Sequence, residues 1–155
     1  MSFNLSGIVK GIIAGFIGTL VLTGLMMIKK SVGIMPSLDP VKMITDMVAN
    51  KTGTHTNMMA GWILHFVIGS IAWGATFSII NNLLPSKSQI TKGIIFGTGA
   101  WLLMMIGPMP MSGAGLFGLS MGIMAPVLTL VLHIVFGATM GLTYSKLTNA
   151  DSSKY

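Results

Sequence analysis

Four apolar segments, each long enough to cross a lipid bilayer as a helix, constrain the fold of this chain more than any other feature. A helix of about 20 residues spans the hydrocarbon core, which is about 30 Å thick. We therefore predict an all-α integral membrane protein, a single domain over residues 1–155 with four transmembrane helices in a bundle. The predicted spans are residues 7–28, 58–84, 90–107 and 118–145.

Composition supports a membrane protein and narrows its chemistry. Hydrophobic residues make up 52% of the chain and charged residues 8%, whereas soluble domains carry about 25% charged residues. The absence of cysteine excludes disulfides, thiolate metal sites and cysteine nucleophiles. The net charge of +6 comes from lysines that flank the apolar segments, so it indicates the lipid bilayer as a partner and not nucleic acid.

Prolines and glycines mark where the helices should end or bend. Pro85 ends the second span, and the third must break at Gly107-Pro108. The third helix is therefore short, which allows part of residues 109–117 to dip back into the membrane edge. Pro126 predicts a kink in the fourth span.

The segment 29–57 is the only long connection in the sequence. Asp39 is a favoured N-cap residue, and Pro40 suits the first helical position. Apolar residues then recur at helical spacing, which predicts a short amphipathic helix over residues 40–49. Such a helix either lies in the membrane interface or packs on the bundle as an ordinary surface helix, and the sequence favours neither.

An even number of spans places both termini on the same side of the membrane. The lysines are divided between the two sides and do not decide the orientation. The connection over residues 107–117 carries no charge, which suits translocation. We therefore expect both termini in the cytoplasm.

The two halves of the sequence resemble each other in an order that predicts a duplicated two-helix hairpin. Because each copy has two spans, the copies would be related by a pseudo-two-fold axis along the membrane normal. His65 and His133 would then lie at matching depths across that axis. The paired segments are residues 10–15 with 92–97, 25–28 with 103–106, 33–36 with 107–110, and 64–69 with 132–137.

Five segments carry a resemblance to a known family: 10–15 (KGIIAG), 61–69 (GWILHFVIG), 101–105 (WLLMM), 111–118 (MSGAGLFG) and 124–133 (MAPVLTLVLH). Together they resemble a family of small bacterial four-span proteins of unknown function. The likeness covers nearly the whole chain apart from its ends. It implies a bacterial inner-membrane protein and supplies no activity.

His65 and His133 are the first candidates for chemistry, because an ionisable side chain inside a span is costly. Neutral imidazole binds metals and haem iron, so two histidines at equal depth predict a metal ion or one haem b held between them. Gly69 and Gly137, each one turn from a histidine, would leave room for the haem ring. The alternative is that each histidine hydrogen-bonds a neighbouring helix.

Other glycines, and the cations that a haem would need, bear on the same hypothesis. Haem propionates would have to be bound by Lys29, Lys30, Lys51 or water, since the chain has no arginine. The glycines are also spaced for close helix contact, which explains most of them without a ligand. The glycines so spaced are Gly7, Gly11, Gly15, Gly93, Gly97, Gly137 and Gly141.

Methionines gather near one membrane face in this topology, since only Met1 and Met140 of the fifteen lie elsewhere. Thioethers are soft ligands that suit Cu(I). Met35, Met109 and Met111 lie beside prolines in the connections, where their side chains could converge on a copper ion. The alternative is that methionine fills irregular gaps or makes an adaptable docking surface.

The sequence contains no standard catalytic set, because its three carboxylates all lie outside the spans. We therefore expect a protein that is not an enzyme. The leading hypothesis is an electron-transfer or metal-handling accessory with haem b or a metal ion between its histidines. The alternatives are a cofactor-free assembly protein that docks a membrane partner or a second copy through its methionine- and glycine-rich face, and a conduit for Cu(I) or a small solute.

Overall fold

The computed structural model describes residues 5–53, 55 and 57–152, and over these residues the chain is helical without strands. Residues 1–4 and 153–155 of the predicted domain lie outside the described residues. The elements are α1 (Leu5–Ser31), α2 (Pro40–Thr52), α3 (Met58–Val67), the π-helix η1 (Ile68–Gly74), α4 (Ala75–Ile80), the 3₁₀-helix η2 (Asn81–Leu83), α5 (Gln89–Ile106), α6 (Pro108–Met111), the 3₁₀-helix η3 (Leu116–Met121) and α7 (Met124–Ser152).

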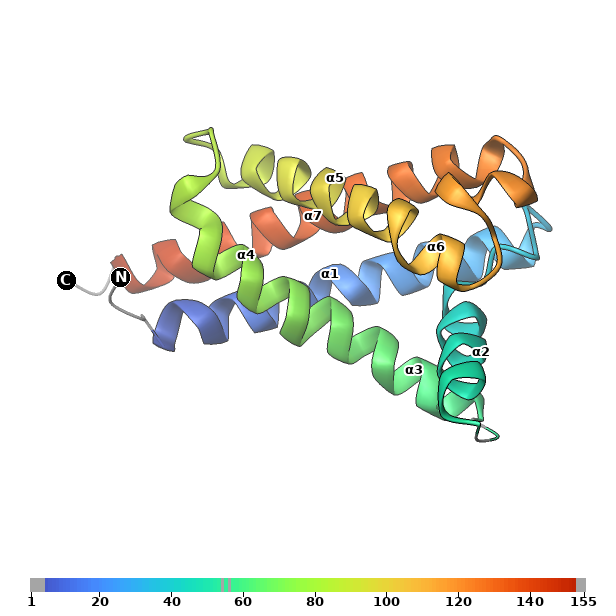
Figure 1. Ribbon diagram of the computed structural model, residues 1–155. Coiled ribbons are helices and arrows are strands. Elements are labelled where there is room, and N and C mark those ends of the chain that lie inside the picture. Colours follow the sequence, from blue (N-terminus) through green and yellow to red (C-terminus); the bar gives the residue numbers. More distant parts are fainter. Residues whose placement is uncertain (1–4, 54, 56, 153–155) are drawn as a thin grey trace.

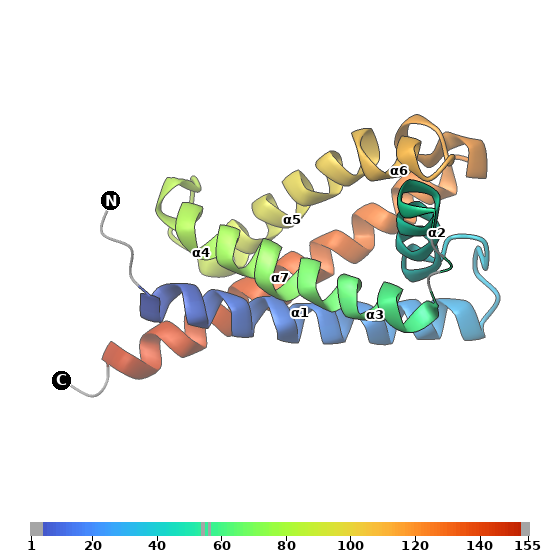
Figure 2. The same ribbon diagram turned by 60° about the horizontal axis from the view of Figure 1, so that its bottom comes forward.

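Four helical segments in this part of the chain are long and apolar enough to cross a membrane, which confirms the predicted all-α, four-span fold. They are Leu5–Ser31, Met58–Leu83, Gln89–Met111 and Met124–Asn149. The protein is thus a multi-pass membrane protein. The start of α1 and the end of α7 lie at one end of the bundle, whereas α2 and α6 lie at the other end (Figures 1 and 2).

Each hairpin closes on glycines. In the first, Gly11 and Gly15 of α1 lie against η1, where a Cβ on Gly15 would be 2.7 Å from the oxygen of Gly69 and 2.9 Å from the Cα of Gly74. In the second, Gly93 and Gly97 of α5 meet Gly137 and Gly141 of α7 in the same manner. The predicted role in close helix contact is confirmed for Gly11, Gly15, Gly93, Gly97, Gly137 and Gly141. The duplication itself stays a prediction.

The π-helix η1 in the second span was not expected from the sequence. The glycines of this span that contact α1, Gly69 and Gly74, are five residues apart, whereas Gly137 and Gly141 of α7 are four apart. A π-helix bonds residues i and i+5, so residues five apart stack as residues four apart do in an α-helix. The π-helix thus absorbs one extra residue and keeps both glycines against α1.

The fourth span begins at Met124 and not at residue 118 as predicted. Backbone conformation explains the difference, because Phe117 (φ 57°) and Gly118 (φ 69°) are left-handed and cannot belong to an α-helix. The predicted kink at Pro126 is also wrong. Pro126 is the third residue of α7, where its missing N–H would have no partner within the helix anyway. The predicted break at Gly107-Pro108 is confirmed.

The predicted amphipathic helix is α2, which begins at Pro40 as expected and ends three residues later than expected. The Asp39 carboxylate accepts a hydrogen bond from the Lys42 amide at the helix start. The helix lies across the end of the bundle (Figure 1) and packs on α3, where Gly61 lets the backbone of Val41 approach. Packing on the bundle is therefore established, and a place in the membrane interface stays a prediction.

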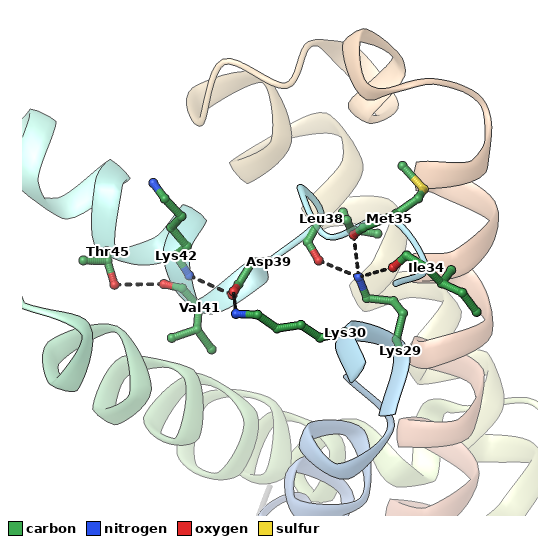
Figure 3. Close-up of polar contacts among 9 residues, drawn as sticks. All are labelled: Lys29, Lys30, Ile34, Met35, Leu38, Asp39, Val41, Lys42 and Thr45. Atoms are coloured by element: carbon green, nitrogen blue, oxygen red, sulfur yellow. Dashed lines mark hydrogen bonds and ion pairs between the residues drawn. The ribbon is translucent and has the colours of Figure 1, made fainter. Parts of the chain in front are cut away.

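A buried lysine holds the connection between α1 and α2. The Lys29 amine donates to the backbone oxygens of Ile34, Met35 and Leu38 at 3.1, 2.8 and 2.9 Å (Figure 3). These three bonds satisfy the ammonium group without a carboxylate. Because they also fold the connection around the end of α1, they set where α2 begins.

A second buried lysine holds the connection between the second and third spans. The Lys92 amine donates to the backbone oxygen of Asn81 at 2.7 Å. The side-chain amides of Asn81 and Gln89 exchange two hydrogen bonds of 2.8 and 3.1 Å beside it. All of these donors and acceptors are paired, so this cluster is structural.

Candidate intramembrane site

His65 and His133, which the sequence analysis paired, line one cavity of about 110 Å³ between the two hairpins. His65 lies in α3 and His133 in α7. Most of the wall is apolar, with Leu22, Ile44 and Phe136 among its residues. The cavity would hold about three or four water molecules by volume.

The His133 ring is held by its own helix. Its Nδ1 lies 2.8 Å from the backbone oxygen of Thr129. A carbonyl oxygen only accepts, so in the neutral ring Nδ1 carries the proton and Nε2 keeps its lone pair. Metal-binding histidines in proteins usually bond the other ring nitrogen to a carbonyl or carboxylate in this way, which fixes the tautomer and the ring orientation.

The His65 ring is held mainly by packing. Its Nε2 lies 3.3 Å from Oγ1 of Thr23 in α1, which is long for a hydrogen bond to a hydroxyl. Trp62 and Phe66 pack edge-on against the imidazole, with ring centroids 6.1 and 5.7 Å away. His65 is 8% exposed. It is thus a buried imidazole whose orientation depends on aromatic neighbours.

Each histidine has one ring nitrogen with no hydrogen-bond partner among the described residues, Nδ1 of His65 and Nε2 of His133. Every fully enclosed side-chain nitrogen or oxygen in this part of the chain has a partner. Both unpartnered nitrogens must therefore face accessible space. Both residues line the same cavity, so an ion held there would have one imidazole from each hairpin beside it.

Two methionines that the sequence analysis did not select also line this cavity, Met26 of α1 and Met104 of α5. The signal was present, because Met26 and Met104 occupy the same position in the paired segments 25–28 and 103–106. Periodicity alone could not select them, since each has a methionine as its next neighbour. In α1 only Met26 faces inward, since it is 7% exposed and Met27 is 63% exposed. In α5 both methionines are covered: Met105 is 0% exposed in an apolar cluster, and the partly buried Met104 is the one that lines the cavity.

A larger cavity of about 290 Å³ adjoins the first. Spans two and three meet at Phe77 and Phe96, with ring centroids 5.4 Å apart, and diverge toward α2 and α6 (Figure 2). The cavity lies on this diverging side and is lined by residues of α2, η1, α5, α6 and α7. Met104 and His133 belong to the walls of both cavities, so the two spaces meet beside the histidine.

Of the three methionines predicted to bind copper, the structure brings only two together. Met109 is 2% exposed in an apolar cluster at the α2 end, and Met35 packs against that cluster. Met111 is 51% exposed and lies outside the cluster, so the predicted convergence of all three is wrong. The α6 turn separates them, because it buries Met109 and leaves Met111, two residues later, on its open side.

The two glycines expected to leave room for a haem ring are in contact with other helices. A Cβ on Gly137 would overlap the backbone oxygen of Gly93, and a Cβ on Gly69 would overlap Oγ1 of Thr19. Gly69 also contributes to the cavity wall, whereas Gly137 does not. The absence of a side chain at these positions is thus used for helix packing, and the expected space for a porphyrin is filled.

Other features of the site also disfavour haem. A pocket for a ligand of that size needs about 300 Å³ or more, and the space between the histidines is about 110 Å³. Two of the lysines proposed for the propionates already have partners: Lys29 donates to three carbonyls, and Lys30 pairs with Asp39 at 3.0 Å (Figure 3). The third, Lys51, is exposed in the last turn of α2. A small ion fits the cavity better.

Comparison with known proteins places the chain in a family without assigning its function. The model of a family of unknown function, DUF6789, matches residues 5–154. The chain belongs to DUF6789. This agrees with the resemblance to an uncharacterised family found in the sequence. No curated protein and no solved structure matches the chain.

Proposed function

We propose that this DUF6789 protein holds a metal ion between His65 and His133 and acts as a metal-handling accessory that is not an enzyme. The observation that carries the proposal is that one imidazole from each hairpin, each with an unpartnered nitrogen, lines one intramembrane cavity. Burying two polar rings in a span is costly unless their nitrogens are paired. A metal ion would pair both nitrogens at once.

The proposal places the protein in a bacterial inner membrane with both termini in the cytoplasm. The uncharged connection between α5 and α7 supports this orientation, because an uncharged segment crosses a membrane more readily than a lysine-bearing one. The duplicated hairpin also belongs to the proposal. It is supported by the paired segments and by the matching glycine contacts in the two halves.

The test is metal analysis of the protein purified in mild detergent, together with its absorption spectrum before and after reduction. We expect about one metal ion per chain, lost in His65→Ala and in His133→Ala. His55→Ala is the control, because His55 is exposed in the connection before α3. A Soret band that is absent from both site variants would show that the bound group is haem b and not a lone metal ion. A folded, colourless protein that binds neither would overturn the proposal.

A second candidate function, docking of a membrane partner, is favoured by methionines exposed at the α2 end of the bundle. Thioether side chains adapt to different partner surfaces. The glycines predicted to share that surface are instead used between helices. This candidate predicts a co-purifying protein or a homodimer that is insensitive to the histidine variants. The exposed methionines are Met27, Met58, Met59, Met111 and Met124, with exposed fractions of 44–67%.

A further inference from the structure

We infer that the metal is copper(I) and that Met26 and Met104 complete its ligand set with His65 and His133. This inference rests on the proposed function and names its ion and its ligands. All four side chains line the same cavity of about 110 Å³. They come from four different elements, α1, α3, α5 and α7, so every span supplies one donor.

The four donors belong to the ligand types that Cu(I) prefers. Thioether sulfur is a soft ligand that favours Cu(I), and imidazole binds copper as well. Magnesium and calcium prefer oxygen ligands, chiefly carboxylates and carbonyls, and no Asp or Glu lines the cavity. The described residues also contain no group of three or more His, Asp or Glu side chains that could hold a metal by themselves. Sulfur must therefore contribute if the ion is to have more than two strong ligands.

Charge favours a monovalent ion. Neutral imidazole and thioether ligands bring no negative charge, so the ion's full charge is buried in an apolar bundle. No carboxylate lines the cavity to offset that charge. A divalent ion would carry twice the uncompensated charge. The site should therefore discriminate against Zn²⁺ and Cu²⁺ and accept Cu⁺.

The positions of the donors agree with the proposed duplication. Met26 pairs with Met104 and His65 pairs with His133 in the repeated segments, so each hairpin supplies one sulfur and one nitrogen. Met104 lies also on the wall of the larger cavity, together with Met43, Met47 and Met109. Thioethers thus continue from the site toward the α2 end of the bundle, which gives a soft ion a path to the histidines.

The experiment is an anaerobic titration of the detergent-purified protein with Cu(I) in competition with a Cu(I) chelator. We expect one Cu(I) per chain, and an affinity that falls about tenfold or more in Met26→Leu and in Met104→Leu. Leucine conserves the volume of methionine, so folding should survive. Met27→Leu and Met111→Leu are matched controls, since both methionines are exposed. X-ray absorption of the bound copper should show sulfur and nitrogen neighbours.

The outcomes separate this inference from the proposed function. Metal that depends on both histidines but is unaffected by the two methionine variants, or that shows no sulfur neighbour, would overturn the inference and leave the histidine site standing. Stronger binding of Zn²⁺ than of Cu⁺ would do the same. Binding of neither ion to a folded protein would overturn both. Ag⁺, which is soft and monovalent and keeps its oxidation state during the titration, should compete with Cu⁺ for the site.

Discussion

Gly93 of α5 and Gly137 of α7 meet backbone to backbone, and a Cβ built on either would overlap the carbonyl oxygen of the other. In a bilayer, helices gain little from the hydrophobic effect and associate through such close packing. The same contact places His133, one turn before Gly137, beside α5. The glycine contact therefore helps to position the site as well as to hold the bundle.

Gly137→Ala should lower the free energy of unfolding by about 1–3 kcal/mol, because the added methyl group meets backbone that cannot move aside. Unfolding in detergent, followed by circular dichroism, measures the effect. Gly99→Ala in α5 is the control, since no atom lies within 4 Å of a Cβ there. Equal stability of the two variants would show that the close approach does not stabilise the bundle.

Lys29→Met should loosen the connection between α1 and α2 (Figure 3). The change leaves the oxygens of Ile34, Met35 and Leu38 without their shared donor, and unsatisfied buried acceptors cost about 1–3 kcal/mol. Hydrogen exchange of the α2 amides should become faster. Lys30→Met removes an ion pair whose lysine side chain is 65% exposed, so it should change exchange far less. Similar effects of both changes would argue against the role given to Lys29.

Acid should weaken the start of α2 through Asp39. Burial alone would raise the pKa of this carboxyl, but the Lys42 amide and the Lys30 ammonium hold the pKa below its ordinary value of 3.8. A carboxyl with a depressed pKa stabilises the folded state fully above its unfolded pKa. That stabilisation is then lost as the pH falls through the lower folded pKa.

The measurement for Asp39 is the melting temperature of the wild type and of Asp39→Asn across pH. The wild type should be the more stable of the two at neutral pH, and the difference should shrink only below about pH 4. Asp46→Asn is the control, because the Asp46 side chain is 54% exposed and its pair with Lys42 is a surface pair. A difference that disappears already near pH 6 would assign the effect to another group.

Deletion of Ile71 should be tolerated better than a deletion elsewhere in a span. Ile71 lies in η1 and is 52% exposed, and its loss would leave Gly69 and Gly74 four residues apart, the α-helical spacing of Gly137 and Gly141. A deletion in a regular α-helix turns everything beyond it by about 100°. Deletion of Val131 in α7, which is 53% exposed, is therefore the matched control and should unfold the bundle. Equal loss of helical signal would show that η1 absorbs no extra residue.

Much of the fold followed from local patterns. Long apolar runs predicted the spans, and Asp39-Pro40 predicted the start of α2, because membrane insertion and helix capping depend on residues that are near in sequence. The fourth span was placed too early because residues 118–123 are apolar enough to continue it. The helix cannot continue through these residues, because the backbone is left-handed at Phe117 and Gly118 and has a φ of 100° at Gly122. A hydropathy pattern carries no information about backbone φ.

Only part of the candidate site could be predicted from the sequence. The repeat paired His65 with His133, and both line the cavity. The same repeat paired Met26 with Met104, but their neighbours Met27 and Met105 are paired as well. The structure exposes Met27 and buries Met105 in an apolar cluster, and only Met26 and Met104 line the cavity. For the same reason Met111 was selected beside Met109, although α6 buries one and exposes the other.

The sequence by itself determined the number of spans, the lack of charge within the second of them, and the small set of polar side chains available inside the bundle. These depend on composition along the chain, which decides what enters a bilayer. The tertiary structure alone decided which side chains share a cavity. That outcome depends on glycine contacts, on the one-residue shift absorbed by η1 and on the divergence of α3 from α5, none of which is a property of any single segment.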